Sequence, residues 1–242
     1  MLKDKIIEVK NIEKNCREKK ILEIDNFIIL KNKFNFIVGG NGSGKTSLLN
    51  ILSLVDQDYK GELYYKGEKI DKTNENLELR RKFSVIWQDP YLYRGNVFYN
   101  IALPLKLRNF DSKIIQDKVK KIAKKIEIEA LLDQSAFTLS SGEKQKVSIA
   151  RALITEPEIL FVDEATTNLD EESIQFFNSH FADLVTEEMT VVMVSHDRRQ
   201  IKLLADYITL LHKGSVKISR KINDFNFQLF GAGIETPIAE LV

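Results

Sequence analysis

Gly39-Gly40-Asn41-Gly42-Ser43-Gly44-Lys45-Thr46 is the stretch that decides the fold, because it fits the phosphate-binding pattern G-x-x-x-x-G-K-[ST]. The apolar run Phe34–Val38 leads into it, and apolar residues follow it at the i, i+3, i+4, i+7 spacing of an amphipathic helix. Those residues are Leu48, Ile51, Leu52 and Val55. Strand, glycine-rich loop and helix in this order predict an anion site built from backbone N–H groups. The alternative, a flexible glycine-rich turn, leaves the flanking strand and helix unexplained.

The composition limits the class of protein. The 242 residues are 43% apolar, enough to bury a substantial core as one domain with an inserted lobe. Lys+Arg 36 against Asp+Glu 35 gives a net charge of +1, which argues against nucleic-acid binding through a broad basic field. The one cysteine, Cys16, has no internal disulfide partner, so we expect a reduced, cytoplasmic compartment.

The chain shows no targeting or membrane-spanning segment. Met1–Glu8 carries charges where a signal peptide has its apolar stretch. Apolar runs such as Val191–Val194 have the length of a strand and fall short of the ~20 residues that a membrane helix needs. Any membrane association is therefore expected to be peripheral and to depend on a partner protein.

The order of expected elements predicts an α/β fold with a parallel-rich core. Ranges 61–70 and 84–87 are expected to form a hairpin and a strand, and strands return at 159–162, at 190–194 and after Gly214. From about residue 89 to residue 156 the pattern is helical. We therefore expect a single domain over 1–242, with a catalytic core of 1–88 and 157–242 and a helical subdomain of 89–156.

One expected helix carries a dense lysine run beside an apolar face. Its apolar face is lined by Ile115, Val119, Ile122 and Ile126, and its lysines are Lys118, Lys120, Lys121, Lys124 and Lys125. The run indicates either a phosphate or nucleic-acid patch or a solvated helix face, and the solvated face is the favoured interpretation.

Polar residues follow the ends of several expected strands. Gln88, the pair Asp163-Glu164 and His196 each come directly after one, as the phosphate loop does. Because ligands bind beyond the carboxyl ends of parallel strands, these positions predict a single active site. One carboxylate of the pair can hold Mg²⁺ through water while the other orients or deprotonates an attacking water. The alternative for the pair is two acidic residues that cap the next turn.

Leu139-Ser140-Ser141-Gly142-Glu143 contains the helix capping box S-x-x-E. It predicts a helix that begins here and buries Val147, Ala150 and Ile154. A helix N-terminus that presents a serine hydroxyl and backbone N–H groups is also suited to bind a γ-phosphate.

The phosphate loop, the Ser140–Glu143 segment and the strand ending in Asp163-Glu164, in this order, resemble the nucleotide-binding subunit of ATP-binding-cassette (ABC) proteins. The resemblance implies a P-loop NTPase core with an N-terminal antiparallel β edge and an inserted α-helical subdomain, with ATP and Mg²⁺ as ligands. It implies that ATP is bound by Gly39, Gly40, Asn41, Gly42, Ser43, Gly44, Lys45, Thr46, Ser47 and Cys16.

The same resemblance assigns the reaction and the contacts between subunits. Glu164 is expected to be the general base, with His196, Gln88 and Lys45 as further catalytic residues. Mg²⁺ is expected at Thr46, Gln88 and Asp163. Two assignments act across a homodimer: Ser140, Ser141, Gly142 and Glu143 bind the nucleotide of the other subunit, and Asp170, after Thr167-Asn168-Leu169, communicates across it.

The chain departs from the family pattern in two places. Ser141-Gly142 and Glu143 stand where the family usually has Gly-Gly and often Gln. Cys16 stands where an aromatic side chain normally stacks on adenine, so stacking worth ~1–3 kcal/mol is lost. We therefore expect ATP and GTP to bind within about an order of magnitude of each other.

The resemblance also implies partners. Separate transmembrane permease subunits are expected to contact about 88–108, with Leu92, Tyr93 and Phe98 in the groove, and a substrate-binding protein outside the membrane is expected to complete the complex. The 92–108 segment looks most like importers of small oxyanions such as tungstate or molybdate. The alternative is a cassette that regulates or mechanically drives a membrane partner, as in lipoprotein release or cell division. A soluble cassette acting on ribosomes or DNA is disfavoured, because the chain has one cassette and almost no net charge.

Overall fold

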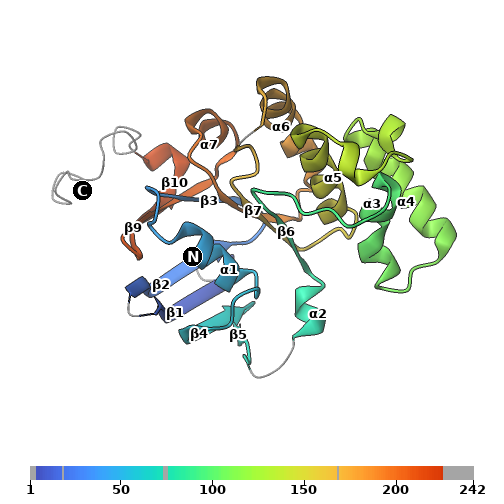
Figure 1. Cartoon of the computed structure of the whole chain (residues 1–242). Coiled ribbons are helices and arrows are strands. Elements are labelled where there is room, and N and C mark those ends of the chain that lie inside the picture. Colours follow the sequence, from blue (N-terminus) through green and yellow to red (C-terminus); the bar gives the residue numbers. More distant parts are fainter. Residues whose placement is uncertain (1–3, 18, 73–75, 168, 226–242) are drawn as a thin grey trace. The chain divides into compact units, whose positions relative to one another are not determined.

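The computed structural model describes residues 4–17, 19–72, 76–167 and 169–225 (Figure 1). Asn168 of the expected interface loop and the segment from 226 onward lie outside these residues. The chain forms two compact units, Met1–Arg80 with Thr190–Val242 (the first unit) and Arg81–Met189 (the second unit).

The first unit holds the phosphate loop and most of the strands. Its elements before the second unit are β1 (Lys5–Cys16), β2 (Lys19–Leu30), β3 (Phe34–Val38), α1 (Lys45–Leu52), β4 (Lys60–Tyr65), β5 (Glu68–Lys69) and α2 (Leu77–Arg80). Its elements after the second unit are β8 (Thr190–Val194), α7 (Arg198–Leu204), β9 (Tyr207–His212), β10 (Ser215–Lys221) and the 3₁₀ turn η3 (Ile222–Asp224).

An antiparallel sheet with the strand order β2-β1-β4-β5 forms one part of the first unit (Figure 1). Ile7, Val9 and Ile12 of β1 are buried, while polar residues between them are more exposed, as expected for a sheet with one face on the core. This sheet confirms the predicted N-terminal antiparallel edge, including the hairpin of β4 and β5.

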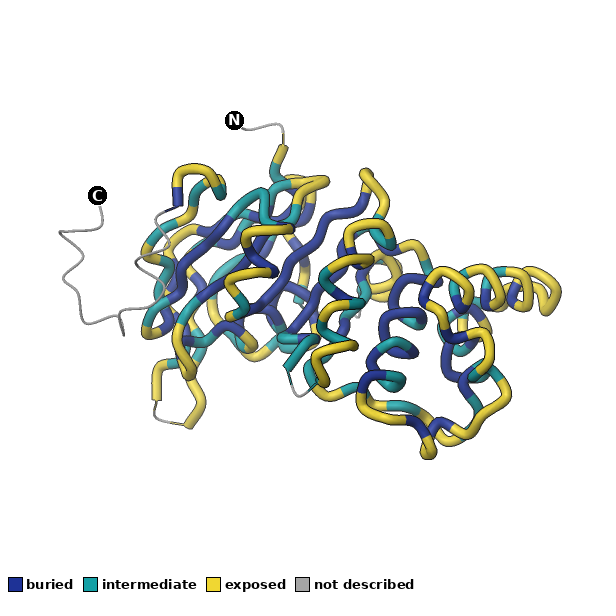
Figure 2. The backbone as a smooth tube through the Cα atoms, turned by 90° about the horizontal axis from the view of Figure 1, so that it is seen from above, coloured by how far each residue is buried: buried dark blue, intermediate teal, exposed yellow. Residues whose placement is uncertain are grey.

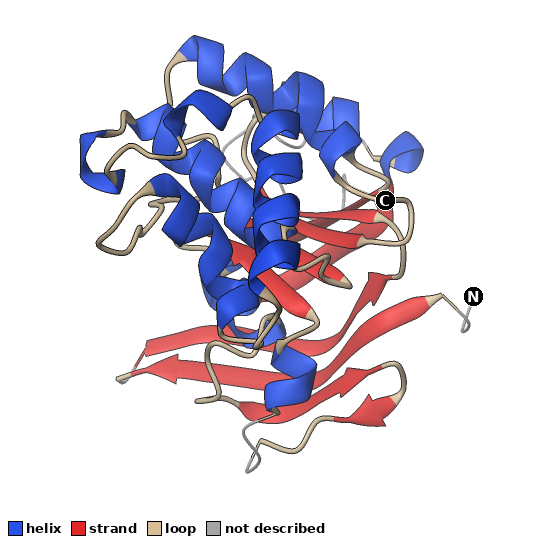
Figure 3. Cartoon of the chain, turned by 90° about the vertical axis from the view of Figure 1, so that its right-hand side faces the viewer, coloured by secondary structure: helices blue, strands red, loops and turns tan. Residues whose placement is uncertain are grey.

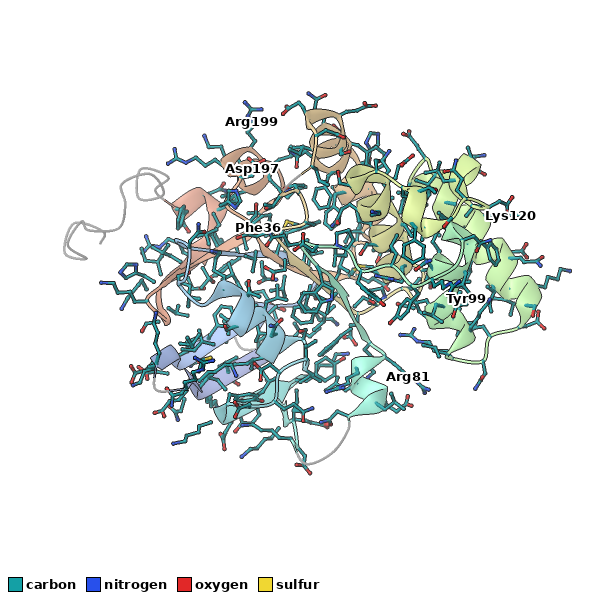
Figure 4. All side chains as sticks on the ribbon, in the orientation of Figure 1. Phe36, Arg81, Tyr99, Lys120, Asp197 and Arg199 are labelled. Atoms are coloured by element: carbon teal, nitrogen blue, oxygen red, sulfur yellow. The ribbon has the colours of Figure 1, made fainter. Side chains whose placement is uncertain are left out.

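The second sheet of the first unit has the order β10-β9-β3-β8, with β3 parallel to both β8 and β9. Every residue of β8 is buried, and so is each of Asn35 to Val38 in β3, including Phe36, which is labelled in Figure 4. Continuous apolar runs of this kind are typical of parallel strands covered on both faces. The burial colours of Figure 2 show these strand interiors in dark blue.

The second unit carries one parallel strand pair and most of the helices. Its elements are β6 (Phe83–Ile86), α3 (Val97–Lys106), α4 (Ser112–Lys125), the 3₁₀ turns η1 (Glu129–Leu131) and η2 (Ala136–Thr138), α5 (Ser141–Leu153), β7 (Ile159–Asp163) and α6 (Glu171–Leu184). Strands β6 and β7 pair in parallel, and α3 packs against both α4 and α5 (Figures 1 and 3). The helical content predicted for 89–156 is confirmed by α3, α4 and α5.

Two local predictions are wrong, and one strand has no counterpart among the predicted elements. Val55 was placed on the buried face of a helix, but α1 ends at Leu52 and Val55 is 55% exposed. Ile122 was placed on the buried face of α4, but it is only half-buried, and Ala123 is buried in its stead. Strand β9 was not predicted at all.

No helix within the described residues is both long enough and apolar enough to cross a membrane.

A buried asparagine fixes the start of α3. The Asn100 Oδ1 atom accepts a hydrogen bond from the Tyr93 N–H at 2.7 Å, and its Nδ2 group donates to the carbonyl oxygens of Tyr93 and Asn96, each at 3.0 Å. Asn100 is fully buried, so water cannot replace these bonds. Its side chain therefore holds the 93–96 segment against the helix.

We expect Asn100→Ala to lower the free energy of unfolding by about 2–3 kcal/mol, because it leaves buried backbone groups without partners. Gln116→Ala, on the exposed side of α4, is the control and changes it by less than about 0.5 kcal/mol. Urea denaturation followed by circular dichroism measures both, and equal effects would show that the Asn100 network does not stabilise the unit.

Candidate functional site

The phosphate loop is held by close backbone contacts between β3 and α1. A Cβ atom on Gly39 would lie 2.2 Å from the Leu211 carbonyl oxygen, and one on Gly44 would lie 2.6 Å from Leu22 Cδ2. Gly44 also has φ +100°, a conformation that side chains disfavour. The Gly214 N–H donates to the Ser43 carbonyl at 2.9 Å. Glycine is therefore required here for packing against a backbone carbonyl at Gly39 and for backbone conformation at Gly44.

Lys45 is held inside this loop. Its side chain is 6% exposed, and its Nζ group donates to the carbonyl oxygens of Gly39 at 3.1 Å and Gly40 at 3.2 Å. Among the residues that the structure describes, the buried Ser43 Oγ atom finds no hydrogen-bond partner. An ammonium group and a buried hydroxyl thus converge within one glycine-rich loop, an arrangement that fits a phosphate group.

The N-terminus of α1 differs from the other long helices. The residue before it, Gly44, has no side chain to accept a hydrogen bond, and the first turn contains no acidic residue. In contrast, a side chain accepts a first-turn N–H at the start of each of α3, α4, α5, α6 and α7. Those five side chains belong to Asn96, Asp111, Ser140, Asp170 and Asp197. The start of α1 therefore fits a bound anion, since neither a capping side chain nor an acidic residue of the first turn offsets the helix dipole there.

His196 lies at the same sheet edge as the phosphate loop. In the parallel register Ile37 of β3 pairs with Val194 of β8. The phosphate loop follows the end of β3 and His196 follows the end of β8, so both segments begin at neighbouring positions on the same edge of the sheet. Ser195 is buried, His196 is exposed and Asp197 is half-buried. Asp197 caps α7 by accepting the Arg199 N–H at 2.7 Å, and both residues are labelled in Figure 4. This cap fixes the backbone beside the histidine.

Gln88 and the two carboxylates meet at one edge of the second unit. Ile86 pairs with Val162 in the parallel β6–β7 register, so the residues that follow both strands emerge side by side. Asp163 is 4% exposed, and Glu164 and Gln88 are half-buried. Gln145 of α5 adds a contact that the sequence did not indicate, because its Nε2 group donates to the Trp87 carbonyl at 3.4 Å.

The backbone of Glu164 is strained. Its φ of +44° lies in the left-handed region, which costs a residue with a Cβ about 1–2 kcal/mol. The turn is closed by a hydrogen bond from the Thr167 N–H to the Glu164 carbonyl at 3.0 Å. Strain of this kind gathers at functional positions, where a required side-chain direction outweighs its cost. Other residues with a Cβ atom, among them Leu54, Glu127 and Glu156, also have positive φ, so the angle alone does not mark a site.

The Ser140–Glu143 segment forms the predicted capping box. Ser140 Oγ accepts the Glu143 N–H at 3.3 Å, and the Glu143 carboxylate accepts the Ser140 N–H at 2.8 Å. The predicted buried residues Val147, Ala150 and Ile154 are buried. The helix-start interpretation is confirmed, while the γ-phosphate role remains a prediction.

The starts of α5 and α6 lie side by side in the second unit. A Cβ atom on Gly142 would lie 2.1 Å from the Ser173 Oγ atom, so the absence of a side chain lets the two helices approach. Asp170 caps α6 by accepting the Ser173 N–H at 2.8 Å. Hydrogen bonds from Ser173, with Lys146 nearby, lower the pKa of the Asp170 carboxyl. A hollow of about 640 Å³ opens here, lined by Ser140, Gly142, Glu143 and Asp170 among others.

The remaining positions that the sequence indicates, Cys16 and the segment after Gln88, include exposed and half-buried side chains. Cys16 ends β1 and is exposed, in register with Lys19 of β2. In the segment after Gln88, Tyr93 is exposed while Leu92 and Phe98 are half-buried. The Arg151 guanidinium lies 5.8 Å from the Tyr93 ring centre. Burial lowers the pKa of Arg151.

The predicted residues thus gather in three groups. The phosphate loop and His196 share one edge in the first unit, Gln88 shares another with Asp163 and Glu164 in the second, and Asp170 borders the Ser140–Glu143 segment. The expected Mg²⁺ ligands Thr46, Gln88 and Asp163 offer hydroxyl, amide and carboxylate oxygens, the donors that Mg²⁺ prefers, so these residue types fit the ion.

Comparisons with known proteins show which family the chain resembles in sequence and in fold. The model of the ABC transporter family matches residues 22–167. The tungstate uptake system ATP-binding protein TupC of Peptoclostridium acidaminophilum is 34% identical over 87% of this chain and 96% of its own length. The phosphate import ATP-binding protein PstB of Thermotoga maritima is 31% identical over 87% of this chain and 88% of its own. A dimeric ATP-binding cassette in a post-hydrolysis state with ADP and Pi has a TM-score of 0.81 and 28% identity, covering 91% of this chain and 100% of that one.

We expect Glu164→Gly to raise the free energy of unfolding by about 1 kcal/mol, because glycine adopts φ +44° without strain. Glu164→Gln keeps the Cβ atom and serves as the matched control, with stability close to that of the native chain. Thermal and urea unfolding measure the difference. A Gly variant that is less stable than the Gln variant would contradict the claim that strain is stored at this residue.

Proposed function

The chain belongs to the ABC transporter family as an ATP-binding subunit that hydrolyses ATP, and from this premise we propose that it energises the import of a small oxyanion of the tungstate or molybdate type. The observation that supports nucleotide binding is the phosphate loop, in which Lys45 lies at a helix N-terminus without a side-chain cap.

In the proposed reaction, Lys45 and the N–H groups that begin α1 bind the β- and γ-phosphates of ATP. Thr46, Gln88 and Asp163 would hold Mg²⁺, which would neutralise charge on the phosphate oxygens. Glu164 orients and deprotonates the attacking water. His196 donates a hydrogen bond to the γ-phosphate.

Two copies of the chain are needed in this proposal. Ser140 and the N–H groups that begin α5 bind the γ-phosphate of the nucleotide held by the other copy, and Asp170 borders the same hollow. A head-to-tail pair related by C2 symmetry forms two such composite sites. The similar dimeric cassette with ADP and Pi supports this assembly.

The membrane partner is proposed to dock on the segment after Gln88. Tyr91 and Tyr93 are exposed there and pack edge to face, with ring centres 5.3 Å apart. Exposed aromatic side chains beside an arginine are typical of protein interfaces. Docking to permease subunits on 88–108 would place the chain on the inner face of the membrane, and a substrate-binding protein would complete the complex outside it.

The substrate class rests on the relatives. Both the tungstate uptake protein and the phosphate importer handle tetrahedral oxyanions, and the tungstate protein is matched over 96% of its length. The residues of the candidate site are proposed to bind nucleotide. We therefore assign the selection of the anion to the membrane and substrate-binding partners.

The experiment that tests the function is purification of Glu164→Gln from detergent-solubilised native membranes with ATP present. Removal of the proposed base slows hydrolysis, so the ATP-bound complex should persist and retain a stoichiometric multi-span protein. Lys45→Ala, which weakens phosphate binding, is the control and should retain less.

The native complex, reconstituted in vesicles with its substrate-binding protein, then tests the substrate. We expect tungstate or molybdate to stimulate ATP hydrolysis at least tenfold more strongly than phosphate at equal concentration. If the Glu164→Gln purification yields only a soluble homodimer without a membrane protein, the transport role is contradicted. If phosphate alone stimulates hydrolysis in the vesicles, only the choice of anion is contradicted.

Nucleotide preference follows from Cys16. We expect the Kd values for ATP and GTP to differ by less than about tenfold in the native chain, because no aromatic ring stacks on the base. Cys16→Tyr should tighten the binding of both nucleotides by about tenfold, while Cys16→Ser should leave it unchanged. Isothermal titration of the Glu164→Gln background measures these constants. A native preference for ATP above a hundredfold would show that another residue recognises the base.

A further inference from the structure

A second hollow in the second unit lies apart from the groups assigned above. It has a volume of about 180 Å³ and is bordered by α4, the C-terminal end of α5 and the segment that begins at the end of α6. Its lining residues are Lys118, Lys121, Ile122, Lys125, Leu153, Ile154, Glu156, Leu184, Thr186 and Met189. None of these residues has a role in the proposed hydrolysis.

The floor of this hollow is apolar. Leu153, Ile154 and Met189 are buried, with only 5%, 4% and 6% of their surface exposed, and Ile122 and Leu184 are half-buried. Because Ile122 faces the hollow, it is not part of the buried face formed by Ile115, Val119 and Ala123. An apolar surface recessed in this way favours an apolar body that displaces water from it.

The rim of the hollow is basic. Lys118, Lys121 and Lys125 have the i, i+3, i+7 spacing of one helix face. The Lys118 Nζ atom lies 2.6 Å from Glu156 Oε1, so this lysine is paired. Within the described residues no ion pair is formed by Lys121 or Lys125. Two ammonium groups therefore border the apolar floor without a matching carboxylate.

We propose that this hollow binds a small amphiphilic anion, a free carboxylate with a short acyl chain. Its headgroup pairs with Lys121 and Lys125, and its chain covers Leu153, Ile154 and Met189. The charge of the rim selects an anion, the floor selects an apolar body, and the volume limits that body to a short one.

A free ligand fits better than a flat membrane surface. The lysine run also contains Lys120 and Lys124, which are exposed and do not line the hollow, and Lys120 is labelled on α4 in Figure 4. A flat anionic surface would bind any exposed lysine of the run through its charge. A ligand in the hollow would bind only Lys121 and Lys125, which border the apolar floor. A ligand bound there would contact the C-terminal end of α5, the helix whose N-terminus is capped by Ser140.

Isothermal titration of the full chain with octanoate tests this proposal, because octanoate has one carboxylate and a short acyl chain. We expect saturable binding to the native chain that weakens at least tenfold in the double variant Lys121→Glu with Lys125→Glu. The matched control is Lys120→Glu with Lys124→Glu, which makes the same change in net charge on the same helix and should weaken binding less than about threefold, since salt screens distant charges.

Three further titrations identify what is recognised. Octanol, which lacks the charge, and inorganic phosphate, which lacks the apolar body, should each bind at least tenfold more weakly than octanoate. Vesicles containing anionic lipid should not distinguish the two double variants. The proposal is overturned if octanoate shows no saturable binding, if both double variants weaken it equally, if octanol or phosphate binds as well, or if vesicles reproduce the difference between the variants. Both double variants replace exposed lysines, and circular dichroism checks that they remain folded.

Discussion

The close backbone packing around the phosphate loop is the constraint on which the rest of the site depends. Gly39 approaches the Leu211 carbonyl and Gly44 approaches Leu22, so the loop is confined between β2 and the end of β9. Confinement holds the loop carbonyls around Lys45 and leaves the first turn of α1 without a side-chain cap. An anion site formed in this way is organised before its ligand binds, which lowers the cost of ordering it.

Parallel strand register then positions the remaining chemistry. In the first unit it places His196 beside the exit of β3, and in the second it places Gln88 beside Asp163 and Glu164. These side chains follow buried strands, so their backbone positions are fixed by the cores of the two units. The left-handed backbone of Glu164 and the capped starts of α5 and α6 complete the set with local hydrogen bonds.

The parts of the fold that depend on local pattern were predictable, and those that depend on distant packing were not. The strand, loop and helix around Lys45 and the capping box at Ser140 follow from residue types a few positions apart. Strand β9 was missed because Tyr207–His212 follows α7 with only two residues between them and no glycine or proline to mark the boundary. The helix before Val55 was extended too far because Leu54 turns the chain with φ +63° without a glycine. The approach of Gly142 to Ser173 depends on two segments thirty-one positions apart, and no local signal records it.

We propose that ATP hydrolysis requires the phosphate loop of one copy and the Ser140 segment of another. The specific ATPase activity of the purified chain, measured over a wide range of protein concentration, tests this claim most directly. We expect the rate of ATP hydrolysis per subunit to rise with protein concentration and to level off where the dimer forms. Light scattering on the same samples reports the formation of the dimer. A rate per subunit that stays constant while the protein remains monomeric would contradict it.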